Sequence, residues 1–329
     1  MTLDAQILSA LRKTRGGSVS GAELSQTLQI SRAAVWARIE DLRKLGYDIE
    51  ASPHQGYRLV SVPDVLHADD LLSQLGEPKV IGRDIRVFEQ TTSTNDVVEK
   101  LARDGLAEGV VVFAESQTKG RGRLGRKWIS PARKGIWFSL LLRYANRPQA
   151  ATQLTVAAAV SIARAIKEET GLAAEIKWPN DILIRGRKVA GILTELNAEL
   201  DSIKYVILGM GVDVNLTNDD FAPELRPIAT SLLIESGQSV PIPRAPLATA
   251  ILRELDHAYH RIKLGEFQQV ADVWEGLCGT LGNLVTIKNG DRLVRGRAES
   301  LDSEGALLVR TEYGHLERVI GGDVTVIPL

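Results

Sequence analysis

The sequence predicts an α+β protein of three domains: an N-terminal winged helix-turn-helix domain (residues 1–64), a central mixed-sheet α/β domain (65–280) and a C-terminal SH3-like β-barrel (281–329). Three observations support this division. Short helical patterns separated by tight turns occupy the first part, and apolar strand-like runs alternate with amphipathic helices in the middle. The last part contains short strands separated by Asn-Gly and Glu-Gly turns, a pattern typical of a small β-barrel.

Composition limits the class of protein. The chain has 329 residues, of which 44% are hydrophobic and 25% charged, so each domain can bury its own core. The net charge of -1 means that any surface for nucleic acid must be local. Cys278 is the only cysteine, which excludes a disulfide framework and suits a reducing compartment. No apolar run approaches the ~20 residues that span a bilayer, and Asp4 argues against a secretory signal, so we expect a cytoplasmic protein.

Three helices are predicted in the first 46 residues. The first ends at Gly16, and Ser20 followed by Glu23 is a capping-box pattern that begins the second. Ser31 caps the third helix, and Gly46 provides its left-handed end. The apolar positions of that helix repeat at i, i+4 and i+7: Val35, Ile39 and Leu42. Two short helices joined by a tight turn indicate a helix-turn-helix, whose second helix can enter the DNA major groove.

Two alternating strands at residues 47–50 and 57–60 predict a hairpin that would form the wing. Residues 1–62 contain eight lysines and arginines against six acidic residues, a net charge of +2, so a single copy should bind DNA weakly. The candidates for DNA contact are Ser31, Arg32, Trp36 and Arg38. Trp36 could instead pack at the edge of the core with the arginines merely solvated, and a winged helix can also bind proteins.

The stretch from residue 118 to 128, called the basic loop below, contains five cations, three glycines and no acid, so we expect an open loop. Its glycines fit G-x-G-x-x-G, but Pro131 lies where the dinucleotide-binding helix should run. The acid that should bind the ribose is also missing, since residues 116–167 contain no Asp or Glu. Two interpretations remain: a solvated basic patch, or a clamp that closes over a phosphate and a carboxylate.

Strands predicted at residues 110–114 and 136–142 flank the basic loop. Residues 91–96, between an expected strand and helix, form a run of short hydroxyl and amide side chains ending in an Asp. Capping a helix needs only one such residue, so the run suits an uncharged polar ligand group such as a urea or amide. A helix is expected from residue 152 to 169.

A sharp Pro-Asn-Asp turn at residues 179–181 leads into a hairpin that ends near residue 193. Strict alternation would place Lys188, Ala190 and Ile192 on one face of its second strand, and Lys188 would project toward the surface that Lys177 also reaches. Glycines at 209 and 211 in the next strand mark a close approach of another group. Two helices follow, at 246–264 and 267–277; the i, i+3 pair His257 and His260 on the first is more typical of surface imidazoles than of a metal site.

Five motifs in collinear order resemble the bifunctional biotin-protein ligase and biotin operon repressor family. They are Ser93-Thr94-Asn95, the basic loop with Gln117, Lys177-Trp178-Pro179-Asn180-Asp181, Gly186-Arg187-Lys188-x-Ala190-Gly191-Ile192-Leu193, and Gly209-x-Gly211-x-x-Val214-Asn215. The resemblance covers nearly the whole chain. It implies a central fold like that of class II synthetases and biotin ligases, with biotin and ATP as substrates and Mg²⁺ as the metal. The reaction would form biotinyl-5'-AMP and transfer biotin to a lysine of a biotin carboxyl carrier protein of the acetyl-CoA carboxylase type.

The family's functional residues can be carried over position by position. The resemblance implies that biotin is bound by Ser93, Thr94, Asn95, Gln117, Arg121, Gly122, Arg123 and Lys188. It implies that the nucleotide is bound by Arg123, Arg126, Trp128, Lys177, Asn180 and Asp181, and it leaves the metal ligands unassigned. The catalytic residues would be Arg123, Lys188 and Asp181. It further implies operator DNA as a partner and a homodimer promoted by ligand.

Two other functions are compatible with the residues. A transcription factor could sense a small molecule without catalysis, and a lipoate-type protein ligase would have a similar central domain. Residues 91–96 and the N-terminal winged helix favour biotin.

Overall fold

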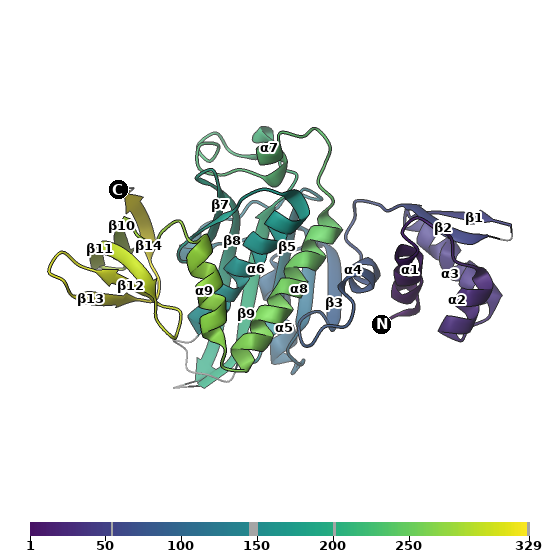
Figure 1. The fold of residues 1–329 in the computed structure, drawn as a ribbon, viewed down its shortest axis with the longest axis horizontal. Helices are drawn as coiled ribbons and strands as arrows, with labels where there is room; N and C mark the ends of the chain where they lie inside the picture. The colour runs from purple at the N-terminus through teal and green to yellow at the C-terminus, as the bar shows by residue number, and fades with distance from the viewer. Residues whose placement is uncertain (54, 145–150, 200–201, 328–329) are drawn as a thin grey trace. The chain divides into compact units, whose positions relative to one another are not determined.

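The computed structural model describes residues 1–53, 55–144, 151–199 and 202–327 (Figure 1). The chain divides into two compact units, Met1–Gly76 and Glu77–Leu329. The domain boundaries predicted after residues 64 and 280 stay predictions. Within the described residues, no helix is both long enough and apolar enough to cross a membrane.

The first unit contains the predicted helix-turn-helix and hairpin. Its elements are α1 (Leu3–Lys13), α2 (Gly21–Leu28), α3 (Arg32–Lys44), β1 (Asp48–Ser52), β2 (Gly56–Ser61) and α4 (Ala68–Leu75). The predicted caps are confirmed: the Ser20 and Ser31 side chains accept hydrogen bonds from the backbone N–H groups of Glu23 and Ala34. Val35, Ile39 and Leu42 are buried as predicted. Helix α4, which packs on α1, was not predicted from the sequence.

The second unit is built on a seven-stranded mixed sheet in the order β3-β4-β5-β9-β8-β7-β6. Its strands are β3 (Asp84–Thr91), β4 (Val110–Gln117), β5 (Gly135–Leu142), β6 (Glu175–Lys177), β7 (Asp181–Ile184), β8 (Arg187–Glu199) and β9 (Ser202–Asp213). Only the β3–β4 pair is parallel. The apolar runs predicted as strands form the central strands of this sheet. These strands are apolar along their length because both faces of the sheet are covered.

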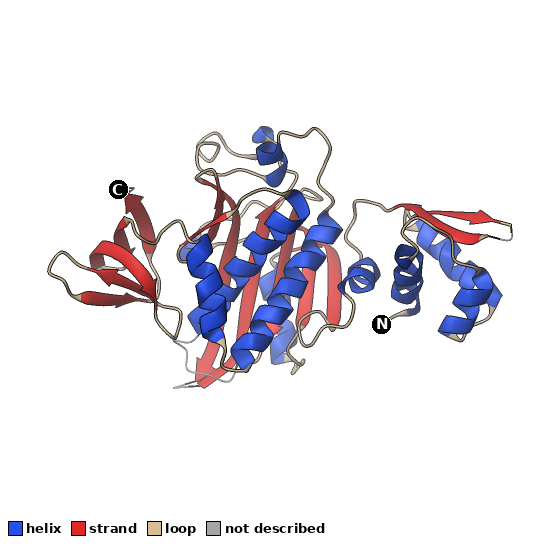
Figure 2. Cartoon of the chain, viewed as in Figure 1, coloured by secondary structure: helices blue, strands red, loops and turns tan. Residues whose placement is uncertain are grey.

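Helices cover the two faces differently. α6 (Thr152–Thr170), α8 (Arg244–Lys263) and α9 (Phe267–Leu277) lie side by side across one face (Figure 2). α5 (Thr94–Arg103) packs on the opposite face, against alternate residues of β4 such as Val110 and Val112. A short helix missed in the sequence, α7 (Leu232–Ser236), follows β9. The face that carries α5 also carries the candidate site.

The predicted alternation along β8 is wrong. Leu183 pairs with Lys188 and Ile182 pairs with Ala190, so Val189 is an extra residue at a β-bulge. A Cβ placed on Gly191 would lie 3.1 Å from Lys188 Nζ, which shows that Lys188 and Gly191 share a face. The bulge changes the side-chain phase of the strand and turns Lys188 toward the α5 face.

The C-terminal part is β-rich. Its strands are β10 (Leu284–Asn289), β11 (Arg292–Leu301), β12 (Leu307–Arg310), β13 (Leu316–Val319) and β14 (Asp323–Ile327), and they form an antiparallel sheet in the order β13-β12-β11-β10-β14. Strand β13 was not predicted from the sequence, because it carries two charged residues in four and has little apolar signal. Closure of this sheet into an SH3-like barrel stays a prediction.

Candidate active site

A cavity of about 720 Å³ opens on the α5 face of the large sheet. All the residues predicted to bind biotin or nucleotide line it: Ser93, Thr94, Asn95, Gln117, Arg121, Gly122, Arg123, Arg126, Trp128, Lys177, Asn180, Asp181 and Lys188. They come from the start of α5, from the end of β4 and the basic loop, and from the β6–β7 and β7–β8 segments, which are distant in sequence. The structure therefore brings the predicted residues together, while their individual roles stay predictions.

One end of the cavity is a network of hydroxyl and amide groups. Gln117 Oε1 accepts hydrogen bonds from Thr94 N at 2.9 Å and Thr94 Oγ1 at 3.2 Å, and Gln117 Nε2 donates to Ser130 Oγ at 2.9 Å. Thr94 Oγ1 also contacts Ser139 Oγ at 2.6 Å, and Ser139 donates to Asn95 Oδ1. Ser93 occupies the N-cap position of α5, but its side chain makes no capping hydrogen bond. Simple N-capping therefore does not explain this polar run.

The basic loop is not open, contrary to our expectation. Gly122 N donates to Arg126 O at 2.7 Å, Trp128 N donates to Gly120 O at 2.9 Å, and Arg121 and Lys127 form a β-bridge. The loop thus folds back on itself as a short hairpin over the cavity. The expectation failed because it counted only charges close in sequence, whereas acidic side chains from other elements neutralise the loop.

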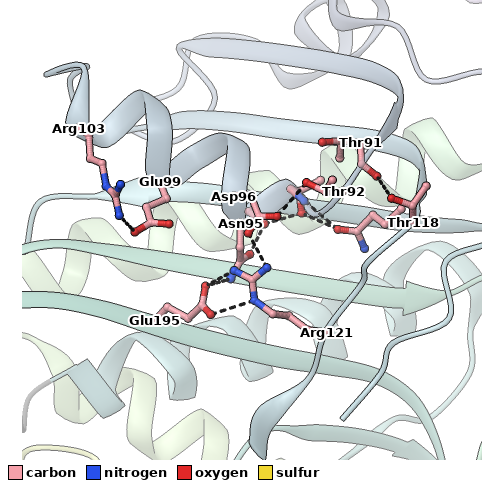
Figure 3. Close-up of polar contacts among 12 residues, drawn as sticks. Thr91, Thr92, Asn95, Asp96, Glu99, Arg103, Thr118, Arg121 and Glu195 are labelled. Atoms are coloured by element: carbon pink, nitrogen blue, oxygen red, sulfur yellow. Dashed lines mark hydrogen bonds and ion pairs between the residues drawn. The ribbon is translucent and has the colours of Figure 1, made fainter. Parts of the chain in front are cut away.

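Arg121 is the clearest case of this neutralisation (Figure 3). Its guanidinium makes two bonds of 3.1 Å to Glu195 of β8 and one of 2.6 Å to Asp96 of α5. Asn95 Nδ2 donates to the same Glu195 carboxylate at 2.7 Å. The polar network around Thr94 is therefore continuous, through Asn95 and Glu195, with the base of the basic loop.

The other two arginines of the loop point to different partners. Arg123 Nη1 donates to Asn180 Oδ1 at 2.9 Å. Burial lowers the pKa of Arg123, and the nearby carboxylates of Asp181 and Asp323 oppose this shift. Arg126 is largely exposed and pairs with Asp323 of β14 at 2.5 Å, so the loop also contacts the C-terminal sheet.

Lys188 and Trp128 lie together in the cavity wall. Lys188 Nζ lies 2.6 Å from Asp181 Oδ1 and 5.2 Å from the centre of the Trp128 ring. Trp128 packs edge-on against Trp137 and lies over Gly191 and Gly211, where an added Cβ would fall 2.9 Å or less from the indole. The prediction that the glycines of β9 mark a close approach is confirmed.

Several residues of the site were missed in the sequence. Ser139 could have been found, because it is the one polar residue in an otherwise apolar strand of eight. Glu195 and Asp323 gave no signal, since single acids in strands are common on solvated faces. Asp213 also lines the cavity and is buried.

Within the described ranges there is no group of three or more His, Cys, Asp or Glu side chains that could hold a metal ion. Magnesium can also be held by one or two carboxylates together with the phosphates of a substrate. Asp181 bears a carboxylate beside Lys188, and the Asn180 amide oxygen accepts from Arg123, so both place oxygen atoms beside cations of the cavity. They could hold an ion that arrives with a nucleotide, and the ion would neutralise phosphate charge there.

The candidate DNA-contacting residues lie on or at the start of α3. Ser31 is its N-cap, and Arg32, Trp36 and Arg38 are exposed. Trp36 is 57% exposed, so it does not pack in the core. Arg38 Nη1 lies 3.7 Å from Asp4 Oδ1, and 47% of the Arg38 side chain remains exposed. These side chains are available for contact, and DNA binding by them stays a prediction.

Comparison with known proteins agrees with this arrangement. Residues 87–213 match the Biotin/lipoate A/B protein ligase family, residues 4–58 match an HTH domain, and residues 280–326 match the Biotin protein ligase C terminal domain. One chain thus combines a helix-turn-helix domain with a ligase of the biotin/lipoate class.

Similarity over the full length defines the family more narrowly. The chain is 37% identical to the Bifunctional ligase/repressor BirA of Bacillus spizizenii, over 98% of each protein. It is 30% identical to the protein of that name from Escherichia coli, over 93% of this chain and 92% of the relative. The chain therefore belongs to the family of bifunctional ligase/repressor BirA proteins. A structure of the Aquifex aeolicus biotin protein ligase in complex with biotin and ATP matches with a TM-score of 0.63 and 28% identity, over 75% of this chain and all of that one.

Proposed function

We propose that this protein is an ATP-dependent biotin-protein ligase that also acts as a biotin-responsive repressor. In the first step, an oxygen of the biotin carboxylate attacks the α-phosphorus of ATP, giving biotinyl-5'-AMP and pyrophosphate. In the second step, the neutral ε-amine of a carrier lysine attacks the activated carbonyl carbon and releases AMP. The observation that carries the proposal is the single cavity in which an uncharged polar network, several cations and an aromatic wall meet under the basic loop.

The chemistry asks the protein mainly to position groups and to stabilise charge. The network of Thr94, Asn95 and Gln117 offers donors and acceptors to a ureido ring. Arg123 and Lys188 would neutralise the carboxylate and the α-phosphate as they approach each other. Asp181, now paired with Lys188, would be freed to help hold Mg²⁺ when the substrates displace that pair.

The other residues of the site would also position substrate groups or neutralise their charge. Arg121 and Gly122 would close over biotin, and Trp128 would lie against the adenine. Arg126, Lys177 and Asn180 would serve the phosphates. The carrier would be a biotin carboxyl carrier protein of the acetyl-CoA carboxylase type, as the names of several relatives suggest.

The helix-turn-helix supports a second role for the same chain. The exposed side chains of Arg32, Trp36 and Arg38 would contact operator DNA, and a homodimer promoted by ligand would join two weakly binding copies. A cytoplasmic location, where carrier and operator would both be available, stays a prediction.

Biotin-dependent exchange of labelled pyrophosphate into ATP tests the ligase. We expect exchange with biotin, loss of it in Arg123→Ala, and normal exchange in Arg103→Ala, a matched change at an exposed arginine of α5. No exchange above the Arg123→Ala background would overturn the proposal. Faster exchange with lipoate than with biotin would replace the substrate.

A mixture with ATP, biotin and a carrier domain separates the enzyme from a sensor without catalysis. Mass spectrometry should find the carrier heavier by one biotinyl group. Tighter DNA binding with biotin but no modified carrier would leave only the sensor.

A further inference from the structure

Glu235 is a buried carboxylate that does not line the cavity and that the proposed chemistry does not use. It belongs to the short helix α7, and its side chain is 0% exposed. Three groups donate to it: Arg187 Nη2 at 2.5 Å, Arg185 Nη1 at 3.3 Å and the Thr230 hydroxyl at 2.8 Å. Taking a carboxylate out of water is costly, and ion pairs offset this cost only when their geometry is good. A buried Glu with three donors therefore needs an explanation.

The backbone of Lys188 is held by a segment outside the main sheet. The pairing of β8 with β9 ends at Ala190, before it reaches Lys188. Lys188 N donates instead to Ile228 O, and Thr230 N donates to Lys188 O, both at 2.8 Å. These two bonds place Lys188 beside Ala229 in a β-bridge, at a point where Ile228 and Ala229 both line the cavity.

Glu235 joins the two segments that meet at Lys188. Arg187 precedes Lys188 in β8, and Thr230 carries the N–H that binds the Lys188 carbonyl oxygen. A single carboxylate oxygen, Oε1, accepts from both Arg187 and Thr230. Hydrogen bonds to an ionised group are about twice as strong as neutral ones. Loss of the Glu235 charge should therefore let the two segments separate and let Lys188 move.

Small movements of Lys188 should matter because its ammonium group is closely surrounded. Lys188 Nζ lies 2.6 Å from Asp181 Oδ1 and 5.2 Å from the centre of the Trp128 ring. The bulge at Val189 interrupts the pairing with β7, so the sheet by itself holds this part of β8 less firmly. Charge stabilisation depends on groups that are already in place, and a misplacement of about 1 Å can cost about a hundredfold in rate.

We propose that Glu235 is a positioning residue for the ligase reaction: it holds β8 against residues 228–230 and so keeps the Lys188 ammonium where the biotin carboxylate meets the α-phosphate. This inference rests on the proposed ligase function. It also gives a role to Arg187, which precedes Lys188 in the fourth motif but does not line the cavity. Both residues act through the position of Lys188 and touch no substrate.

Hydrogen exchange measured at single amides tests the contact directly. In Glu235→Gln, the amides of Lys188 and Thr230 should exchange about tenfold faster than in the parent, because the bonds between the two segments open more often. The Met210 amide, in the middle of β9, should keep the rate of the parent. Glu254→Gln changes an acid that pairs with Arg164 between α6 and α8, and it should leave all three amides unchanged.

Two outcomes of that measurement would contradict the inference. Unchanged exchange at Lys188 and Thr230 would show that Glu235 does not hold the segments together. Equally faster exchange at Met210 would show that Glu235 only supports the stability of the whole unit.

The pyrophosphate exchange reaction tests whether this contact serves catalysis. Glu235→Gln should lower kcat about tenfold and change KM for biotin and for ATP by less than about threefold, because Lys188 acts most strongly as the two anions approach each other. Arg187→Gln, at a side chain that is 32% exposed, should lower kcat in the same way with less effect on folding. Arg187→Lys keeps a charged donor and should recover most of the lost rate. Glu254→Gln should match the parent.

Unchanged kcat in Glu235→Gln and Arg187→Gln would overturn the inference, and so would a raised KM at unchanged kcat. Equal losses in Arg187→Gln and Arg187→Lys would also overturn it, because the charge on residue 187 would then have no effect. Absence of biotin-dependent exchange in the parent would instead refute the proposed function. In that case the amide measurements would still decide whether Glu235 holds Lys188 in place.

Discussion

Gly209 is a residue at which one methyl group should damage the site. A Cβ there would lie 2.2 Å from Asn95 Oδ1 and 3.0 Å from Asn95 Cγ. Asn95 cannot give way freely, because it accepts from Ser139 and donates to Glu195. The glycine therefore allows α5 to approach β9 closely enough to build the polar network.

We expect Gly209→Ala to raise KM for biotin about tenfold, with a smaller effect on KM for ATP, because about 1–3 kcal/mol of strain would fall on the Asn95 network. The exchange assay measures both constants. Gly276→Ala is the matched control: a Cβ at Gly276 in α9 meets nothing within 4 Å and should leave both constants unchanged. Equal kinetics in the two variants would contradict the proposed role of Asn95.

The basic loop shows how an element depends on residues outside it. Five cations in eleven residues repel one another, yet the loop folds as a hairpin because Glu195, Asp96 and Asp323 reach it from other elements. Glu195 makes both a two-bond contact with Arg121 and a bond with Asn95. It therefore couples the loop to the polar network (Figure 3).

Glu195→Gln should loosen the basic loop. The change neither adds nor removes a lysine or arginine, so the sites at which trypsin can cut stay the same. We expect trypsin to cut within residues 118–128 faster in this variant than in the parent, because the charge that holds Arg121 is gone. Glu99→Gln removes an acid that binds only Arg103 on the surface of α5, so it should be cut like the parent. The measurement is limited proteolysis with mass mapping, and identical loop cleavage in all three proteins would show that Glu195 does not hold the loop.

The helix α3 is the element on which repression should depend. Arg32→Ala removes an exposed cation from its first turn and should weaken DNA binding while leaving stability unchanged. Titrations at several salt concentrations should give a shallower salt dependence for the variant, by about one unit of slope for each phosphate that Arg32 neutralises. An unchanged slope would remove Arg32 from the DNA-contacting set.

In the ligase unit, a buried ion pair ties helix α8 on the far face to the strands that flank the basic loop. Arg244 of α8 and Glu115 of β4 are 0% and 1% exposed and lie 2.5 Å apart. Arg244 also donates to the carbonyl oxygen of Gly135, at the start of β5. Glu115 precedes the basic loop and Gly135 follows it, so one guanidinium on the far face fixes both ends of the loop.

Arg244→Met should cost about 3–5 kcal/mol of unfolding free energy, because it removes the buried guanidinium that balances the Glu115 charge. Denaturation followed by tryptophan fluorescence reports on this unit, since it holds four of the five tryptophans. Arg164→Met breaks a half-exposed pair with Glu254 between α6 and α8 and should cost about 1 kcal/mol or less. Similar losses in the two variants would show that burial of the pair does not matter.

Much of this architecture could be predicted because the signals are local. The helix caps at Ser20 and Ser31 and the end of α6 at Gly171 depend on neighbours in the chain. The basic loop could be placed between two strands of the sheet because strands were predicted directly before and after it in the sequence. In contrast, the β-bulge at Val189 places Lys188 on the face of Gly191 rather than on the predicted face of Ala190, because register depends on the partner strand. The weakly apolar β13 was missed for a related reason, since pairing within the sheet rather than composition makes it a strand.

The sequence by itself determined the helix-turn-helix, the alternating strands and helices of the central part, the family resemblance and the candidate binding residues that prove to line the cavity. Only the tertiary structure decided that the basic loop is folded rather than open, and that Glu195 and Asp323 neutralise it. The same holds for Asp213, because its neighbours along the chain do not indicate that it is buried in the cavity wall. The physical reason is that charge pairing and desolvation act through space, between groups that only the fold brings together.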